Sequence, residues 1–371
     1  MHFDLSHHEI LDRISAVDPI KYARTRNYLN GRVTYLSPFI SRGVISGKQV
    51  LESVLAKGHK PWQIEKFIQE LAWREYFQRV WQAKGALIET DLKQPQPGVQ
   101  HHHMVTAVAN AQTGIDAIDQ GIHELYETGY LHNHLRMYVA SITCNIAGAH
   151  WAQPARWLYH HLLDGDIASN HCSWQWVAGA FSSKKYFCNQ ENINKYTGSM
   201  QRNSFLEQGY DEISYMPMPE TLCSTLSSIY TTVLPVTQPL DIDSNKPTLV
   251  YNSYNLDPLW RKELDANRVL LLEPSHFSAY PVSEKVMDFI LNQASKINGI
   301  QIHVGEYTDL LDIYKNDGPS NLLISKEHPA FRHYRGIQDD RDWIFPSVTG
   351  YHPSFFAYWK KCERLLKTLV R

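Results

Sequence analysis

The first half of the chain carries apolar residues at the spacing of an amphipathic helix. Within residues 61–83 they stand at positions 64, 67, 68, 71, 77, 80 and 81, which is helical periodicity. The same spacing predicts further helices over residues 115–127, 132–147 and 154–163. Because strictly alternating strand patterns are few before residue 215, we predict that this half is mainly α.

The pattern changes after residue 215. Residues 216–246 hold several prolines among serines and threonines, which predicts a linker or a strap over the surface. Beyond it, apolar strand-like runs alternate with amphipathic stretches. Strands are expected over Thr248–Tyr254, Arg268–Glu273, Ile300–Val304 and Asn321–Ser325, and helices over Ser283–Lys296 and Pro353–Thr368. This alternation predicts a small parallel sheet.

The chain is therefore expected to consist of three consecutive parts. A mainly α domain spans residues 1–215, a linker spans 216–246, and a smaller α/β domain spans 247–371. The length of 371 residues is sufficient for two domains with separate cores. The α/β part contains no Gly-x-Gly-x-x-Gly motif and no Walker loop, so no fingerprint predicts a nucleotide there.

Composition limits the function classes. The net charge of −2 differs from the basic balance of a sequence-independent DNA binder, so any DNA binding requires a local patch. The 5 cysteines form no Cys-x-x-Cys pair, which is typical of a reducing cytosol and gives no metal site. His101–His103 is interpreted as a polar loop rather than a metal site. With no leader and no run of about 18 apolar residues, we expect a cytoplasmic protein that is not in the membrane.

The most informative string is residues 164–176, Asp-Gly-Asp-Ile-Ala-Ser-Asn-His-Cys-Ser-Trp-Gln-Trp. If its second half is helical, Asn170 and Trp174 share a face, whereas Trp176 points elsewhere. The two carboxylates can accept hydrogen bonds from the N–H groups of a ring system. Taken alone, such a string is also typical of a solvated turn before a buried aromatic helix.

Further motifs precede this string in a fixed order. They are Tyr22 with Arg26, Thr34-Tyr35-Leu36-Ser37-Pro38, Glu70–Phe77 and Thr128–Met137. Together, over roughly residues 20–197, they make the chain similar to the photolyase/cryptochrome flavoproteins. The resemblance implies a helical, FAD-binding domain in the first half. Photolyases usually carry an α/β antenna domain before the helical one, so the C-terminal α/β part is interpreted as a relocated antenna domain. The sequence leaves open whether it binds an antenna chromophore and which one.

The resemblance implies a set of residues around FAD. Thr34 and Ser37 offer hydroxyls to the phosphates, and Arg136 pairs with Asp164 or Asp166 across the flavin. Asp164 then faces the N3/C4 edge of the ring, and Asn170 lies at N5. The full set expected at the cofactor is Tyr22, Thr34, Tyr35, Leu36, Ser37, Phe67, Arg74, Asn133, Arg136, Asp164, Asp166 and Asn170.

The resemblance also implies a DNA partner, single- or double-stranded, that contains cyclobutane pyrimidine dimers. Glu70 is expected to hydrogen-bond the damaged bases, and Trp73 and Trp176 to pack against them, which suits a flipped dinucleotide. Asn133 and Met137 replace the histidines of (6-4)-photolyases, so the chain resembles the cyclobutane-dimer type. The expected substrate residues are Arg26, Glu70, Trp73, Asn133, Met137 and Trp176.

Light-driven reduction of a flavin in this family uses a chain of indoles. Trp174 and Trp151 match its first two members, whereas residues 85–105, where the third is expected, contain no tryptophan. Trp157 or Tyr159 substitutes for it, or the route ends early. The residues expected to carry the chemistry are Trp174, Trp151, Asn170 and Glu70.

These residues predict a deoxyribodipyrimidine photolyase, a carbon–carbon lyase that splits the dimer by electron transfer from photoexcited reduced FAD, and a monomer is expected. Two alternatives stay open. One is a blue-light photoreceptor that binds FAD without repair. The other is a helical scaffold that binds partner proteins and no flavin, against which Asp164, Asp166, Arg136 and Asn170 argue.

Overall fold

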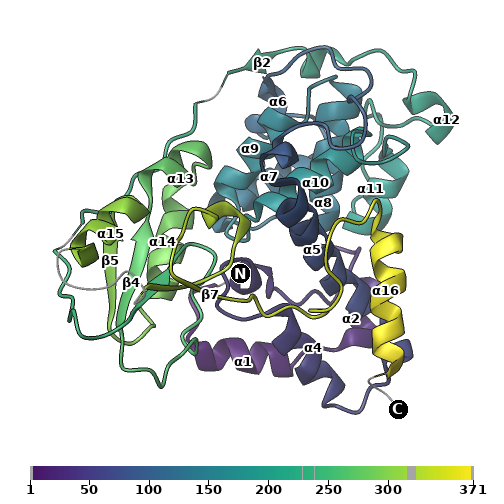
Figure 1. Ribbon diagram of the computed structural model, residues 1–371. Coiled ribbons are helices and arrows are strands. Elements are labelled where there is room, and N and C mark those ends of the chain that lie inside the picture. The colour runs from purple at the N-terminus through teal and green to yellow at the C-terminus, as the bar shows by residue number, and fades with distance from the viewer. Residues whose placement is uncertain (1–2, 228, 238, 316–322, 369–371) are drawn as a thin grey trace. The chain divides into compact units, whose positions relative to one another are not determined.

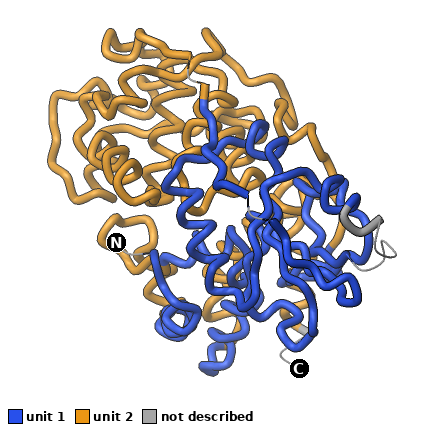
Figure 2. The backbone as a smooth tube through the Cα atoms, turned by 90° about the vertical axis from the view of Figure 1, so that its left-hand side faces the viewer, with its two compact units in different colours: residues 1–17, 35–59, 230–348 blue, residues 18–34, 60–229, 349–371 orange. Residues whose placement is uncertain are grey.

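A computed structural model of the chain describes residues 3–227, 229–237, 239–315 and 323–368. The chain forms two compact units, shown in different colours in Figure 2. The α/β unit comprises residues 1–17, 35–59 and 230–348, and the helical unit comprises residues 18–34, 60–229 and 349–371. Each unit thus combines distant stretches of sequence. The consecutive parts 1–215, 216–246 and 247–371 remain a prediction of functional domains.

The helical unit confirms the helices expected from apolar periodicity. Its helices, labelled in Figure 1, are α2 (Pro19–Thr25), α5 (Glu65–Lys84), α6 (Thr106–Ala109), α7 (Asp116–Thr128), α8 (Asn133–Ala140), α9 (Ala152–His161), α10 (Ile167–Ala178), α11 (Gln190–Thr197), α12 (Tyr210–Ile213) and α16 (Phe355–Thr368). A π-helical stretch, Ser141–Ile146, continues α8. Two short strands, β1 (Met104–Val105) and β2 (Thr225–Leu226), pair antiparallel.

Helix α10 is buried on most of its surface. Its side chains from Ile167 to Ala178 are mainly apolar and mostly buried, and it packs among α5, α8 and α9. Asp166 caps its N-terminus, where its carboxylate accepts from the Ser169 N–H at 2.8 Å. Gly179 ends the helix in the left-handed region, with φ of 85°. These two ends fix where the residues of the 164–176 string lie.

The α/β unit contains the parallel sheet that the sequence predicts. Its strands are β3 (Thr248–Tyr251), β4 (Asn267–Leu272), β5 (Ile300–Val304), β6 (Leu323–Lys326) and β7 (Ile337–Asp339), in the spatial order β5-β4-β3-β6-β7 with every pair parallel. Residues 321–322 of the expected fourth strand lie outside the described residues. The helices are α1 (His7–Ser15), α3 (Ser37–Ser41), α4 (Gly47–Leu55), α13 (Pro274–Ala279), α14 (Glu284–Ala294) and α15 (Tyr307–Lys315).

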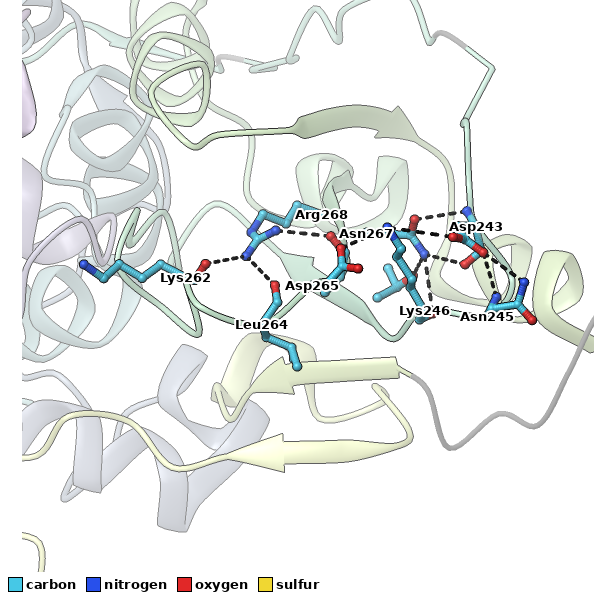
Figure 3. Close-up of polar contacts among 10 residues, drawn as sticks. Asp243, Asn245, Lys246, Lys262, Leu264, Asp265, Asn267 and Arg268 are labelled. Carbon is cyan, nitrogen blue, oxygen red and sulfur yellow. Dashed lines mark hydrogen bonds and ion pairs between the residues drawn. The ribbon is translucent and has the colours of Figure 1, made fainter.

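Asn267 sets the register where β3 and β4 begin. Its side-chain amide donates to the carbonyl of Asp243 at 2.9 Å, and its carbonyl oxygen accepts from the Asp243 N–H at 3.1 Å (Figure 3). Arg268 next to it donates to four loop carbonyls, those of Arg261, Lys262, Leu264 and Ala266. These bonds fasten the loops that lead into β3 and β4.

Candidate active site

Asp164 and Arg136 form a closed ion pair in the helical unit. Both carboxylate oxygens of Asp164 accept from Arg136 Nη2 at 2.9 Å. The Asp164 side chain is 5% exposed. Arg136 Nε also donates to the Leu131 carbonyl at 2.8 Å, so the guanidinium is held at two points. Of the two partners that the sequence offers to Arg136, the structure pairs it with Asp164.

Asp166 is paired with α5 instead. Its Oδ2 accepts from Arg74 Nη2 at 2.9 Å and from Gln78 Nε2 at 2.5 Å. Arg74 and Gln78 are four residues apart and share one face of α5. Gln78 was not predicted as a site residue from the sequence. Its four-residue spacing from Arg74 could have indicated it, because residues so spaced share a helix face. Two carboxylates, each with its own guanidinium, thus lie two residues apart at the start of α10.

Several buried polar atoms near these pairs have no hydrogen-bond partner among the described residues. They are Arg74 Nε, Ser169 Oγ, His132 Nε2 and His134 Nε2. Buried polar groups in folded proteins are normally satisfied, so a polar ligand or water is expected to bind them. A flavin dinucleotide carries ring nitrogens, carbonyls, hydroxyls and phosphates. The residues present therefore fit FAD.

His132 presents a hydrogen-bond donor. Burial lowers the pKa of His132 to about 4, and that of His134 to about 4, so both rings are neutral at pH 7. His132 Nδ1 accepts from the His134 N–H at 3.2 Å, and caps α8. A neutral imidazole that accepts at Nδ1 carries its proton at Nε2. Nε2 of His132 is therefore an N–H donor, and a backbone hydrogen bond with Arg26 also acts on this ring.

The other residues expected at the cofactor are placed as follows. Asn170 is buried, and its amide donates to the Ala155 carbonyl at 2.7 Å, which fixes its orientation. Tyr22 packs edge-on against Phe67, with ring centroids 5.2 Å apart. Asn133 is exposed at the start of α8.

The expected phosphate loop is divided between the units. Thr34 belongs to the helical unit, whereas Tyr35, Leu36 and Ser37 belong to the α/β unit. There Tyr35 has a φ of 53°, its carbonyl accepts from Arg13 at 3.2 Å, and Ser37 begins α3. The role of these four residues at the phosphates stays a prediction.

Glu70 and Arg26, both expected at the substrate, bind each other. Arg26 Nη2 lies 3.0 Å from Glu70 Oε1, and Lys66 lies 3.2 Å from the same oxygen. Met137 is half-buried, and Trp176 is 38% exposed with its ring 5.9 Å from that of Tyr186. The carboxylate expected to meet damaged bases is therefore already paired with two cations.

Trp73 is stacked on a residue of the C-terminal helix. The ring of Phe355 lies parallel to that of Trp73, with centroids 3.8 Å apart and an interplanar angle of 9°. Phe355 is 2% exposed. This contact was not predicted from the sequence, because the two residues are far apart in the chain. The available signal was the aromatic run at the start of α16, which needs a partner surface.

Helix α16 is anchored on α5 by buried polar contacts as well. Tyr358 Oη donates to Glu75 Oε1 at 2.7 Å, and both side chains are buried. Tyr76 Oη donates to the His352 carbonyl at 3.2 Å, and Trp359 Nε1 to Glu65 at 3.3 Å. Burial, with the Glu75 charge, raises the pKa of Tyr358, so its hydroxyl stays a donor. Helix α16, which carries Phe355 onto Trp73, is therefore packed firmly within the helical unit.

The indoles expected in electron transfer are all buried. Trp151, Trp157 and Trp174 are each no more than 2% exposed. Trp151 Nε1 donates to Asp91 Oδ1 at 2.7 Å, and Trp157 Nε1 to Tyr126 Oη at 3.0 Å. Tyr159, the other candidate for an outer step, is also buried.

A known protein-family model matches a segment within the helical unit. Residues 67–208 match the model of the FAD binding domain of DNA photolyase. A deoxyribodipyrimidine photo-lyase of Synechococcus sp. is 36% identical over 115 residues, which are 30% of this chain and 24% of that protein. Cryptochrome DASH of Danio rerio is 30% identical over 176 residues, 43% of this chain and 32% of that protein. The chain thus spans a third or less of these relatives' length.

Among solved structures, the cryptochrome of Synechocystis sp. PCC6803 aligns with 53% of this chain and 44% of its own, at 24% identity and a TM-score of 0.47.

In the described part of this chain, no helix combines the length and the apolar character needed to cross a membrane. The motifs of the helical unit and the match over residues 67–208 show that this part of the chain is similar to the FAD-binding domain of photolyases and cryptochromes, which supports FAD as the cofactor.

Proposed function

We propose that the chain is a light-driven electron-transfer flavoprotein whose helical unit holds FAD. The observation that carries this proposal is the double ion pair, Asp164 with Arg136 and Asp166 with Arg74, beside buried polar atoms that lack partners. Bound FAD supplies light absorption and one-electron chemistry. The protein supplies a cation at Arg136, a donor at His132 Nε2 and an amide at Asn170 that is fixed by Ala155.

An absorption spectrum of the purified full chain tests this proposal. We expect bands near ~375 and ~450 nm, typical of a bound oxidised flavin. Asp164→Ala should lose them, because Arg136 then has no carboxylate partner. Asp116→Ala is the matched control, since Asp116 is exposed in the first turn of α7. A wild type that stays colourless after incubation with FAD would refute the proposal.

Repair of cyclobutane dimers is the first finer candidate. It is supported by the residue set Arg26, Glu70, Trp73, Met137 and Trp176 in the helical unit and by the names of the photolyase relatives. On this proposal the partner is damaged DNA, and the protein is cytoplasmic and monomeric. On this proposal a damaged base packs against Trp73, one face of which Phe355 already covers.

A photoreceptor that binds FAD without repair is the second candidate, and the stack of Phe355 on Trp73 favours it. Phe355 covers one face of the Trp73 ring, and α16 is held there by the buried Tyr358–Glu75 bond. Reduced, illuminated protein should then leave thymine dimers intact in single- and double-stranded DNA. Restoration of the dimers to thymines under blue light would instead establish repair.

A further inference from the structure

Trp151 is a buried indole whose N–H points at a carboxylate. Its side chain is 0% exposed, and Nε1 donates to Asp91 Oδ1 at 2.7 Å. In the described part of the chain, the Trp151 ring contacts two aromatic rings, and both belong to histidines. The ring centroids of His150 and His171 lie 5.6 Å and 5.4 Å from that of Trp151. The ring contacts of Trp151 thus provide no further indole or phenol for an electron to come from.

Asp91 is held in place by its other contacts. Its Oδ2 accepts from the Gln96 N–H at 2.8 Å, and His150 Nε2 lies 3.3 Å from Oδ1. Gln96 also binds the backbone on both sides, because its Oε1 accepts from the Trp151 N–H at 2.9 Å and its Nε2 donates to the Ala149 carbonyl at 2.8 Å. The carboxylate and the indole are therefore fixed relative to each other by backbone contacts.

This cluster reaches the surface. The Asp91 side chain is 23% exposed, and His150 is stacked on the exposed His102 with ring centroids 4.9 Å apart. Burial lowers the pKa of His150 although Asp91 acts in the opposite direction, so the ring is mainly neutral at pH 7. His150 is therefore not a permanent cation beside the Asp91 carboxylate.

We propose that Asp91 accepts the Nε1 proton of Trp151 when Trp151 loses an electron. The inference rests on the proposed light-driven function, in which a photoexcited flavin is the oxidant and Trp174 the intermediate donor. One electron leaves the indole, which makes its N–H far more acidic. The N–H bond then breaks, its electron pair stays on nitrogen, and the proton bonds to Oδ1. The products are a neutral indolyl radical and a neutral carboxylic acid.

The geometry meets the requirement for such a transfer. A proton acceptor has to lie within hydrogen-bond reach of the proton that it takes, about 2.6–3.2 Å between heavy atoms. Asp91 lies in residues 85–105, the segment in which the sequence lacks a third tryptophan. An outer indole slows recombination of the separated charges, and a proton acceptor at the second indole can do the same in a different way. The acceptor traps the oxidised indole as a neutral radical by removing the proton, whereas an outer indole would donate a further electron and move the hole outward.

The decisive variant is Asp91→Asn in the full chain with FAD bound. The amide oxygen of Asn still accepts the Nε1 hydrogen bond, but a neutral amide cannot take the proton. Glu89→Gln is the matched control, because Glu89 lies two residues away and pairs with Arg156 at 2.8 Å. Transient absorption after a laser flash distinguishes the cationic from the neutral tryptophan radical.

Wild type and Glu89→Gln should give the neutral radical. Asp91→Asn should give a radical that stays cationic and recombines roughly tenfold faster, equal to about 1.4 kcal/mol in the barrier. Neutral radical of unchanged lifetime in Asp91→Asn would overturn the inference. Wild type that binds FAD and forms no tryptophan radical would overturn the electron route and the inference together, whereas wild type without FAD would refute the proposed function itself.

A second measurement needs no flavin. In the FAD-free protein, the NMR signal of the Trp151 Nε1–H should be shifted downfield and exchange slowly, because it is buried and bonded to a carboxylate. Asp91→Asn should move this signal upfield, and Glu89→Gln should leave it in place. A Trp151 signal that does not respond to Asp91→Asn would show that the contact is not formed, and would overturn the inference without reference to FAD.

Discussion

Replacing Phe355 by alanine tests whether the C-terminal helix covers Trp73. Phe355 is 2% exposed, lies 3.8 Å from the Trp73 ring centroid, and also meets Tyr76 at 6.0 Å. Removing a buried phenylalanine typically lowers the free energy of unfolding by about 3–5 kcal/mol. Because Phe355 stands in the first turn of α16, where the chain relaxes more easily, we expect a value near the lower end. Urea unfolding of the full chain measures it.

Phe356→Ala is the control for the same helix turn. Phe356 is 71% exposed, so its removal should change the free energy of unfolding by no more than about 0.5 kcal/mol. Equal effects of the two variants would contradict the packing described for α16. Phe355→Ala should also uncover Trp73, and so tighten binding of dimer-containing DNA by roughly 1–3 kcal/mol, the scale of one base stacked on an aromatic ring. Unchanged DNA binding in a folded Phe355→Ala protein would refute the idea that α16 blocks a lesion site.

Three further predictions concern the ion pairs, the indoles and the histidines. Asp164→Asn should lower the free energy of unfolding by about 2 kcal/mol in urea titrations, below the value for a fully buried pair, because Arg136 remains 21% exposed to water. Trp174→Phe and Trp151→Phe should each slow flavin photoreduction by roughly tenfold or more, and Trp157→Phe by less; unchanged rates in all three variants would exclude this route. Burial lowers the pKa of His132 to about 4, and of His171 and His276 to about 3, below the ordinary 6.5. The unfolded chain therefore binds more protons between about pH 3 and 6.5, so stability should fall as the pH is lowered through that range, and a urea midpoint that is equal at pH 7.5 and pH 5 would contradict this.

The helices were predictable because their signal is local. The spacing over residues 61–83, 115–127 and 154–163 reports which side chains share a face, and the structure forms α5, α7 and α9 there. The parallel sheet was predictable for a similar reason, since short apolar strands alternate with amphipathic helices. The stack of Phe355 on Trp73 was not predictable, because periodicity indicates that α16 has an apolar face and not which surface covers it.

The partners of Asp164 and Asp166 could not be predicted from the sequence either. From the sequence, Arg136 was a partner for either Asp164 or Asp166. The structure separates them because Arg74 and Gln78 project from one face of α5 onto Asp166, which leaves Arg136 to Asp164. A four-residue spacing on α5 indicated that Arg74 and Gln78 act together. It did not indicate that their face meets α10.

The covered Trp73 and the carboxylate beside Trp151 favour the same function. In a repair cycle the electron returns to the flavin after each dimer is split, so a proton acceptor at Trp151 contributes nothing to the cycle itself. A photoreceptor needs a photoproduct that lasts long enough to be recognised, and transfer of the Trp151 proton to Asp91 would prolong it. It also has no need of a free stacking face at Trp73, which Phe355 occupies. If Asp91→Asn shortens the radical lifetime and reduced, illuminated wild type also repairs dimers, the two features serve different functions, and α16 is a cover that damaged DNA displaces.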